Sequence, residues 1–252
     1  MQSDTRPFPR LKPGEIFAGS NHYSIVNAYY LAYYAVSFGY TYRRLEMTPI
    51  QGRHQTWSKL PAMWDTLTDP RCDIVVVFDG DAFPNALTVP LEAMMDRWGF
   101  GLNSTFLMAH DPDGEMNYFG GNLATNFGLW FLRRNQNAFQ LLTKIMSCPD
   151  KVPGCDRWKW EFAHEQAAFA QYFKNTYDQG RNREFVIAPC DEANGHWEFL
   201  DCKGSIVTHG WSVKGKIPGR LESLVLKDTL IYSIHKDFEL IIKQAATFIK
   251  NM

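Results

Sequence analysis

The stretch DIVVVFDGD, residues 73–81, decides the fold of this chain. Residues 74–78 form an unbroken, largely β-branched apolar run without polar alternation. Such a strand is covered on both faces, as a central strand of a parallel sheet is. Because ligands of open α/β sheets lie outside the carboxyl ends of the strands, the acidic triplet Asp79-Gly80-Asp81 lies where chemistry is expected.

Strand and helix patterns alternate on both sides of this stretch. Besides residues 73–78, we expect strands at 15–19, 40–46, 106–109, 129–132 and 185–188, and helices at 25–38, 56–69, 91–98, 136–146 and 161–172. Residues 1–14 predict an extended arm, and residues 221–252 predict C-terminal helices that cover the domain. The sequence therefore predicts an α/β fold in which a mainly parallel central sheet is flanked by helices, in one domain over residues 1–252.

Length and composition agree with this fold and exclude other classes. The 252 residues are within reach of one α/β domain, and 45% apolar with 21% charged residues indicates a large core rather than disorder. A formal net charge of −1 argues against nucleic-acid binding, which requires excess Lys and Arg. Since no run of about 18 uncharged apolar residues is present, we expect no transmembrane segment. The first residues also lack the apolar segment of a secretory signal.

The cysteine pattern leaves two interpretations open. Five cysteines guarantee at least one unpaired thiol, and no C-x-x-C pair suggests a zinc or redox site. Cys148 and Cys155 flank a short loop and would pair locally in an oxidising compartment. Ordinary reduced thiols are the interpretation we favour from the sequence.

The acidic triplet predicts a metal site. Neighbouring carboxylates repel one another unless a cation lies between them. Oxygen ligands of this kind suit Mn²⁺ or Mg²⁺, and Gly80 permits a tight turn and the close approach of a ligand. A surface turn in which Asp caps a helix is the structural alternative. A phosphohydrolase of the haloacid-dehalogenase type, with Asp79 as nucleophile, is another alternative, although Ala82-Phe83 follows the triplet in place of the Thr or Val typical of that class.

Five segments, taken together, resemble the GT-A-fold glycosyltransferases, particularly the retaining fungal and plant α-galactosyl-, α-mannosyl- and α-xylosyltransferase families. They are WSKLP at 57–61 with Trp64 and Leu67, IVVVFDGDAF at 74–83, TNFGLWFLR at 125–133, HEQAAF at 164–169, and THGW at 208–211 with Lys214. Their order and spacing cover about residues 55–215. The resemblance implies a single GT-A (Rossmann-like) domain with a D-x-D motif. It also implies a hexosyl- or pentosyltransferase that moves sugar from a nucleotide-diphosphate donor with retention.

The resemblance also implies the roles of individual residues. Asp79, Asp81 and His209 would hold Mn²⁺ or Mg²⁺ against the donor diphosphate. The remaining residues implied in cofactor binding are Ala18, Gly19, Ser20, Lys59, Gly80, Gly128, Trp211 and Lys214. Trp211 would pack against a sugar ring, and Lys214 would contact the phosphates. His209 as a plain core or surface histidine is the alternative.

Three further residues are implied in catalysis. Asn126 would lie beside the donor sugar or the acceptor, where Gly128 lets its strand approach the substrate; a simple turn is the alternative for both. Glu165 and Gln166 would orient sugar hydroxyls, or Glu165 would stabilise an oxocarbenium-like transition state. Since they are adjacent on a helix, they cannot share a face, and we expect at least one to face away from the pocket.

The expected partners are a nucleotide sugar, UDP-sugar before GDP-mannose, and an acceptor that is a glycan, a protein or a small molecule. A non-catalytic carbohydrate-binding protein on a degenerate transferase fold is the alternative from a different functional class. Without a signal or anchor in the chain we expect a cytoplasmic protein, with the Golgi lumen as the alternative if an N-terminal anchor was removed.

Overall fold

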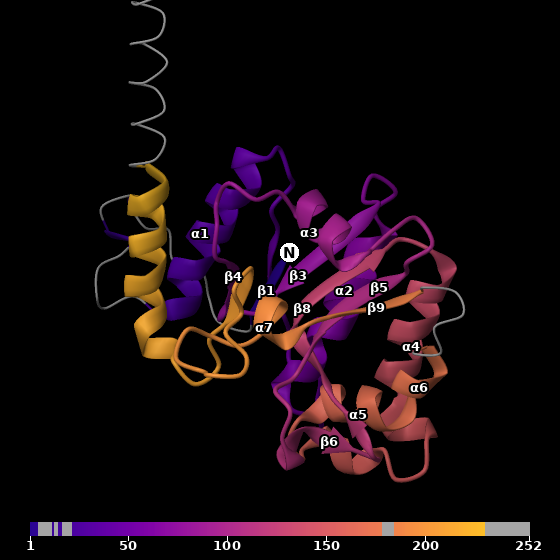
Figure 1. The fold of residues 1–252 in the computed structure, drawn as a ribbon. Coiled ribbons are helices and arrows are strands. Elements are labelled where there is room, and N and C mark those ends of the chain that lie inside the picture. The colour runs from indigo at the N-terminus through magenta and orange to yellow at the C-terminus, as the bar shows by residue number, and fades with distance from the viewer. Residues whose placement is uncertain (5–11, 13–14, 17–21, 178–183, 230–252) are drawn as a thin grey trace, which may run out of the picture.

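A six-stranded sheet lies at the centre of the protein (Figure 1). It is described by a computed structural model that covers residues 1–4, 12, 15–16, 22–177 and 184–229. The strand order is β2-β1-β3-β8-β5-β9, with bounds β1 Gln2–Asp4, β2 Arg44–Glu46, β3 Ile74–Phe78, β5 Phe106–His110, β8 Thr125–Arg133 and β9 Phe185–Ala188. β8 runs antiparallel to both of its neighbours, and the other pairings are parallel. The expected α/β fold with a mainly parallel sheet is confirmed.

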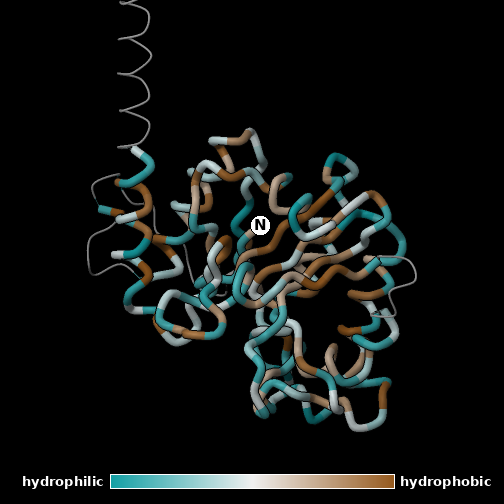
Figure 2. The backbone as a smooth tube through the Cα atoms, in the orientation of Figure 1, coloured by the Kyte–Doolittle hydropathy of each residue, from teal (hydrophilic) through white to brown (hydrophobic). Residues whose placement is uncertain are grey.

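β3 is buried on both faces, which explains its unbroken apolar sequence. Val75 and Val77 pack into one core cluster, and Val76 and Phe78 pack into the other. Much of the central sheet is coloured as hydrophobic in Figure 2. Because successive side chains of a strand point to opposite faces, only an apolar run can fill both clusters.

Helices cover both faces of the sheet. α2 (Lys59–Thr68), α4 (Gln136–Lys151) and α5 (His164–Tyr172) contribute to the first cluster. α1 (Tyr23–Ser37), α3 (Leu91–Trp98) and a helix over residues 217–229 contribute to the second cluster. The short helices are η2 Gln55–Ser58, η3 Glu115–Asn117, η4 Asp156–Lys159, α6 Lys174–Tyr177, α7 Cys190–Ala193 and η5 Lys214–Lys216.

Two small sheets complete the strand topology. β4 (Ala82–Pro84) pairs antiparallel with β10 (Val207–His209), and β6 (Tyr118–Phe119) pairs with β7 (Asn122–Leu123). The register of the first pair sets His209 opposite Ala82. This pairing, which the sequence did not predict, brings residue 209 beside the acidic triplet.

The structure corrects several expected boundaries. Residues 2–4, expected in an extended arm, form a strand between β2 and β3, because backbone pairing in the sheet needs no apolar sequence pattern. β8 begins at Thr125 rather than Leu129, and α4 continues to Lys151 with Pro149 in its last turn. The expected strand at 15–19 and the expected helices beyond residue 229 lie largely outside the described residues. One domain over residues 1–252 stays a prediction.

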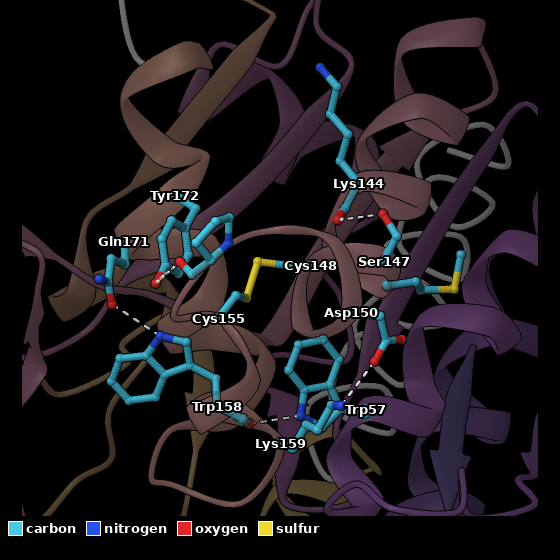
Figure 3. The surroundings of a disulfide bond; sticks show 12 residues. Trp57, Lys144, Ser147, Cys148, Asp150, Cys155, Trp158, Lys159, Gln171 and Tyr172 are labelled. Atoms are coloured by element: carbon cyan, nitrogen blue, oxygen red, sulfur yellow. Dashed lines mark hydrogen bonds and ion pairs between the residues drawn. A yellow bond between two sulfur atoms is a disulfide. The ribbon is translucent and has the colours of Figure 1, made fainter.

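Two disulfides form where the sequence favoured reduced thiols. Cys148, in the last turns of α4, bonds to Cys155 (Figure 3), and Cys190 bonds to Cys202. Around the first disulfide, the Trp57 indole donates to the carbonyl of Trp158, so η2 is tied to the same loop. Cys72 is the free thiol. Among the described helices, none has both the length and the apolar character that a membrane crossing requires.

Candidate functional site

The acidic triplet and His209 meet at the carboxyl end of β3. Asp79 follows β3 directly, Asp81 precedes β4, and His209 ends β10. One ligand atom from each of the three lies within 4.8 Å of the others, and His209 Nε2 is 3.2 Å from Asp81 Oδ1. Asp81 and His209 are buried, whereas the Asp79 side chain is 25% exposed, so the group is open to solvent on one side. The structure thus brings together the three side chains that the sequence assigned to a metal.

Cationic side chains balance the carboxylates of this group. Lys59 Nζ donates to both oxygens of Asp79 at 2.9 Å, and Lys214 Nζ is 3.1 Å from Asp81 Oδ2. Burial tends to raise the pKa of Asp81, but the neighbouring His209 and Lys214 outweigh it and hold that pKa well below its usual value. Burial tends to lower the pKa of His209, but the charge of Asp81 outweighs it and raises that pKa. Two carboxylates and an imidazole that need this much positive charge are a suitable donor set for a hard divalent cation.

The backbone of the triplet is fixed by a buried asparagine of α1. Asn27 Nδ2 lies 3.4, 3.2 and 2.8 Å from the carbonyl oxygens of Asp79, Gly80 and Ala82. The Asp79 amide also donates to the carbonyl of Gly128. The two carboxylates therefore project from a turn that is held from both sides. Asn27 escaped the sequence analysis, although a lone amide within an apolar helix was a signal that could have identified it.

Gly128, within an irregular part of β8, leaves the space for the His209 ring. Met108 of β5 pairs with Trp130, but the next residue, Ala109, pairs with Asn126, so residues 127–129 bulge on this side. A Cβ on Gly128 would lie 2.3 Å from His209 Cε1 and 2.5 Å from its Nδ1. The sequence interpretation gave Gly128 a close approach to substrate. In the structure the group that approaches it is His209.

A buried carboxylate, Asp111, gathers the amides around the site. It follows β5 and accepts hydrogen bonds from Asn126 Nδ2 at 2.7 Å, from Asn194 Nδ2 at 3.1 Å and from Gln166 Nε2. Burial raises the pKa of Asp111, and these amides act against that rise. Asn194 Oδ1 lies 3.1 Å from His209 Nδ1, which connects Asp111 to the metal group. Asp111 was recognisable as a polar residue at the carboxyl end of a strand, whereas Asn194 had no such signal.

Glu165 and Gln166 engage different partners, and both point inward. Glu165 is 2% exposed, and its Oε1 lies 3.6 Å from Lys59 Nζ. Burial raises the pKa of Glu165, with Lys59 acting against that rise. Gln166 Oε1 accepts the Phe127 amide at 3.1 Å while its Nε2 donates to Asp111. We expected one of the two to face away from the pocket, but both belong to the buried network.

The other predicted residues lie as follows. The Trp211 ring is 5.2 Å from the His209 ring, at the edge of the metal group. Asn126 Oδ1 accepts the Gly128 amide at 2.6 Å, so it supports the β8 bulge. Ala18, Gly19 and Ser20, the expected nucleotide-pocket residues, lie outside the described residues.

Comparison of the structure with solved structures identifies a fold. A glycosyltransferase involved in the glycosylation of the major capsid of PBCV-1 matches with a TM-score of 0.60 at 14% identity, covering 89% of this chain and 97% of that one. The chain therefore has a glycosyltransferase fold. Two further structures match less well. Mouse xyloside xylosyltransferase 1 in its apo form has a TM-score of 0.41 at 12% identity, covering 64% of this chain and 65% of that one. A197 from STIV has a TM-score of 0.36 at 11% identity, covering 75% of this chain and 79% of that one. No protein-family model matches the sequence, and no curated protein matches it.

Proposed function

We propose that this chain is a metal-dependent glycosyltransferase that moves a sugar from a nucleotide-diphosphate donor to an acceptor hydroxyl. The observation that carries the proposal is the meeting of Asp79, Asp81 and His209 at the carboxyl end of β3. On a glycosyltransferase fold, this edge of the sheet is where a nucleotide is expected to bind. We favour a UDP-sugar as donor, Mn²⁺ or Mg²⁺ as metal, and retention at the anomeric carbon.

The charged side chains divide the work of holding the donor. Asp79, Asp81 and His209 hold the cation, which when bound neutralises the charge that develops on the leaving diphosphate. Lys214 is 45% exposed, and its ammonium group contacts one oxygen of Asp81 and lies 5.5 Å from the centre of the Tyr23 ring; we assign it to a phosphate of the donor. Lys59 is buried between Asp79 and Glu165 and stays as a fixed positive charge.

The uncharged side chains position the sugar and the acceptor. Asn126 and Gln166 flank the buried carboxylate Asp111, and we assign them to the sugar hydroxyls. Trp211 offers its ring to one face of a sugar. Glu165, unlike these, is an acidic residue; it is buried beside Lys59, and we assign it to the reaction centre through its contact with that lysine. A retaining transfer of this kind leaves deprotonation of the acceptor to the departing phosphate, and we assign no separate base.

In the phosphohydrolase alternative Asp79 is a nucleophile, whereas in our proposal it is a metal ligand beside Asp81 and His209. The glycosyltransferase fold favours the ligand role. Aluminium or beryllium fluoride trapped on Asp79 would restore that alternative. Turnover of a nucleotide sugar that disappears with EDTA excludes the non-catalytic carbohydrate-binding protein. The acceptor, which we place among glycans, proteins and small molecules, requires a separate screen.

Thermal unfolding with UDP and GDP, each with Mn²⁺, with Mg²⁺ and without metal, tests the proposal. A ligand at 100 times its Kd stabilises by about 2.7 kcal/mol, and at this chain length each kcal/mol raises Tm by about 2–4 °C. We expect UDP to raise Tm by about 5–10 °C with Mn²⁺ and not without it. Asp81→Asn should abolish this rise, and Asp96→Asn on the exposed side of α3 should retain it. If no nucleoside diphosphate raises Tm with either metal, the proposed function is wrong.

A further inference from the structure

The orientation of the His209 ring is set by the residue on its far side. An imidazole has two nitrogens, and a neutral ring offers a lone pair on only one of them. In the structure Nε2 faces Asp81 at 3.2 Å and Nδ1 faces Asn194 Oδ1 at 3.1 Å. An amide oxygen accepts hydrogen bonds and cannot donate them, so Nδ1 carries a hydrogen and the lone pair of the neutral ring is on Nε2.

The contacts of Asn194 establish which of its amide atoms faces the ring. Asn194 Nδ2 donates to the backbone oxygen of His110 at 2.9 Å and to Asp111 Oδ1 at 3.1 Å. The His110 backbone oxygen is an acceptor only, and an ionised Asp111 is too, so a flipped amide would place an oxygen against two oxygens. The oxygen of Asn194 is thereby directed at His209. Asp111 is itself held by Asn126 and Gln166, which makes this direction rigid.

The backbone of the same segment supports the ring as well. Asn194 caps the C-terminal end of the short helix α7, and its backbone N–H donates to the carbonyl of Cys190. The carbonyl of Gly195 accepts the His209 amide at 2.7 Å. The Cys190–Cys202 disulfide closes the loop that carries both residues. Side chain and main chain of residues 194–195 therefore hold the same histidine.

We propose that Asn194 is a positioning residue for the metal centre, which fixes the tautomer and the angle of His209 so that Nε2 is presented to the cation beside Asp81. This rests on the proposed function, since it assumes a divalent ion among Asp79, Asp81 and His209. The second partners of metal-bound histidines orient the ring, and their loss lowers metal affinity by about 10- to 100-fold. Asn194 itself is not one of the three proposed ligands.

Mn²⁺ binding to the whole chain, measured from the free Mn²⁺ signal in electron paramagnetic resonance, tests this proposal. We expect Asn194→Ala to weaken Mn²⁺ binding by about 10- to 100-fold. In the His209→Ala background the same substitution should cause no further loss, because its effect passes through the ring. Asn85→Ala is the matched control: it removes an amide that bonds Gly204 and Thr208 beside the same β4–β10 pair without contacting His209.

The outcomes separate this proposal from the one on which it rests. If the wild-type chain binds no Mn²⁺, the positioning role is wrong, and the proposed function fails with it if no nucleoside diphosphate raises Tm with either metal. If the wild type binds Mn²⁺ and Asn194→Ala binds it equally well, only the positioning role is wrong. An equal loss from Asn194→Ala with and without His209 also overturns it, since a general loss of structure gives that result. Asn194→Asp provides a second check, because it keeps an acceptor for Nδ1–H and should retain the affinity within about threefold while losing stability beside Asp111.

Discussion

Replacing Gly128 by alanine places a methyl group where the His209 ring lies. The new Cβ would be 2.3 Å from His209 Cε1 and 2.8 Å from Asn126 Oδ1, whereas non-bonded carbons rest about 3.5–4.0 Å apart. The ring must therefore move by more than about 1 Å. The φ of Gly128 is outside the left-handed region, so the cost arises from this contact and not from the backbone. Overpacking of this kind costs about 1–3 kcal/mol, which lowers Tm by about 2–12 °C at this chain length.

The displaced ring should also lose its metal. We expect Gly128→Ala to weaken Mn²⁺ binding by about 10- to 100-fold, measured by titration calorimetry on the folded variant. Gly101→Ala is the matched control, since a Cβ there meets no atom within 4 Å, and it should change stability by less than about 0.5 kcal/mol. A folded Gly128→Ala variant that binds Mn²⁺ like the wild type would refute the argument that this glycine makes room for a ligand.

Three further perturbations have defined outcomes. Lys59→Met leaves Asp79 and the buried Glu165 without their shared cation. The free energy of unfolding, measured by chemical denaturation without metal, should fall by about 3–5 kcal/mol. A loss below about 1 kcal/mol would contradict this. Burial lowers the pKa of His164 to about 4, and His54 adds to the effect. Between about pH 6.5 and 4 the unfolded chain therefore binds more protons than the folded chain, and the free energy of unfolding falls as pH falls through that window. The reference variant is His164→Asn, because asparagine tolerates the positive φ of this residue. Between pH 7.5 and 5 the free energy of unfolding of the wild type should fall by about 1 kcal/mol more than that of the variant, a value reduced because His164 is partly exposed. Equal losses would show that His164 does not titrate this way. Replacing the Cys190–Cys202 pair by serines should lower stability by about 2–4 kcal/mol and weaken Mn²⁺ binding. Replacing the Cys148–Cys155 pair should lower stability and leave Mn²⁺ binding unchanged. Equal Mn²⁺ affinities of the two variants would show that the Cys190–Cys202 disulfide does not support the site.

The parts of the fold that the sequence predicted are those with a strong local pattern. β3 was recognisable because both of its faces are buried, and α3 begins and ends where its sequence pattern does. β8 was predicted too short because the bulge at residues 127–129 interrupts its pairing with β5. β4 and β10 have three residues each, too few for any periodicity, and β1 is equally short.

The same distinction applies to the site. The two aspartates were recognisable from their place at a strand end, and His209 came from a resemblance that covers about residues 55–215. The amide of Asn194 was not found, because its importance lies in which atoms face it and not in its neighbours in sequence. Asn27 was overlooked, although a lone amide within an apolar helix was a signal. The disulfide between Cys190 and Cys202 was missed for the same reason, since spacing alone does not give connectivity.

The short ladder between β4 and β10 determines when the site exists during synthesis. Asn85 and Thr208, which bond across this ladder, are 123 positions apart. A ribosome that adds about 5–20 residues per second needs about 6–25 s to cover that distance, and the closing of so long a loop comes after local structure has formed. For that time a nascent chain carries the two aspartates without their histidine. A cation that requires all three proposed ligands would therefore bind only after this part of the fold is complete, and would stabilise the finished fold without guiding its early steps.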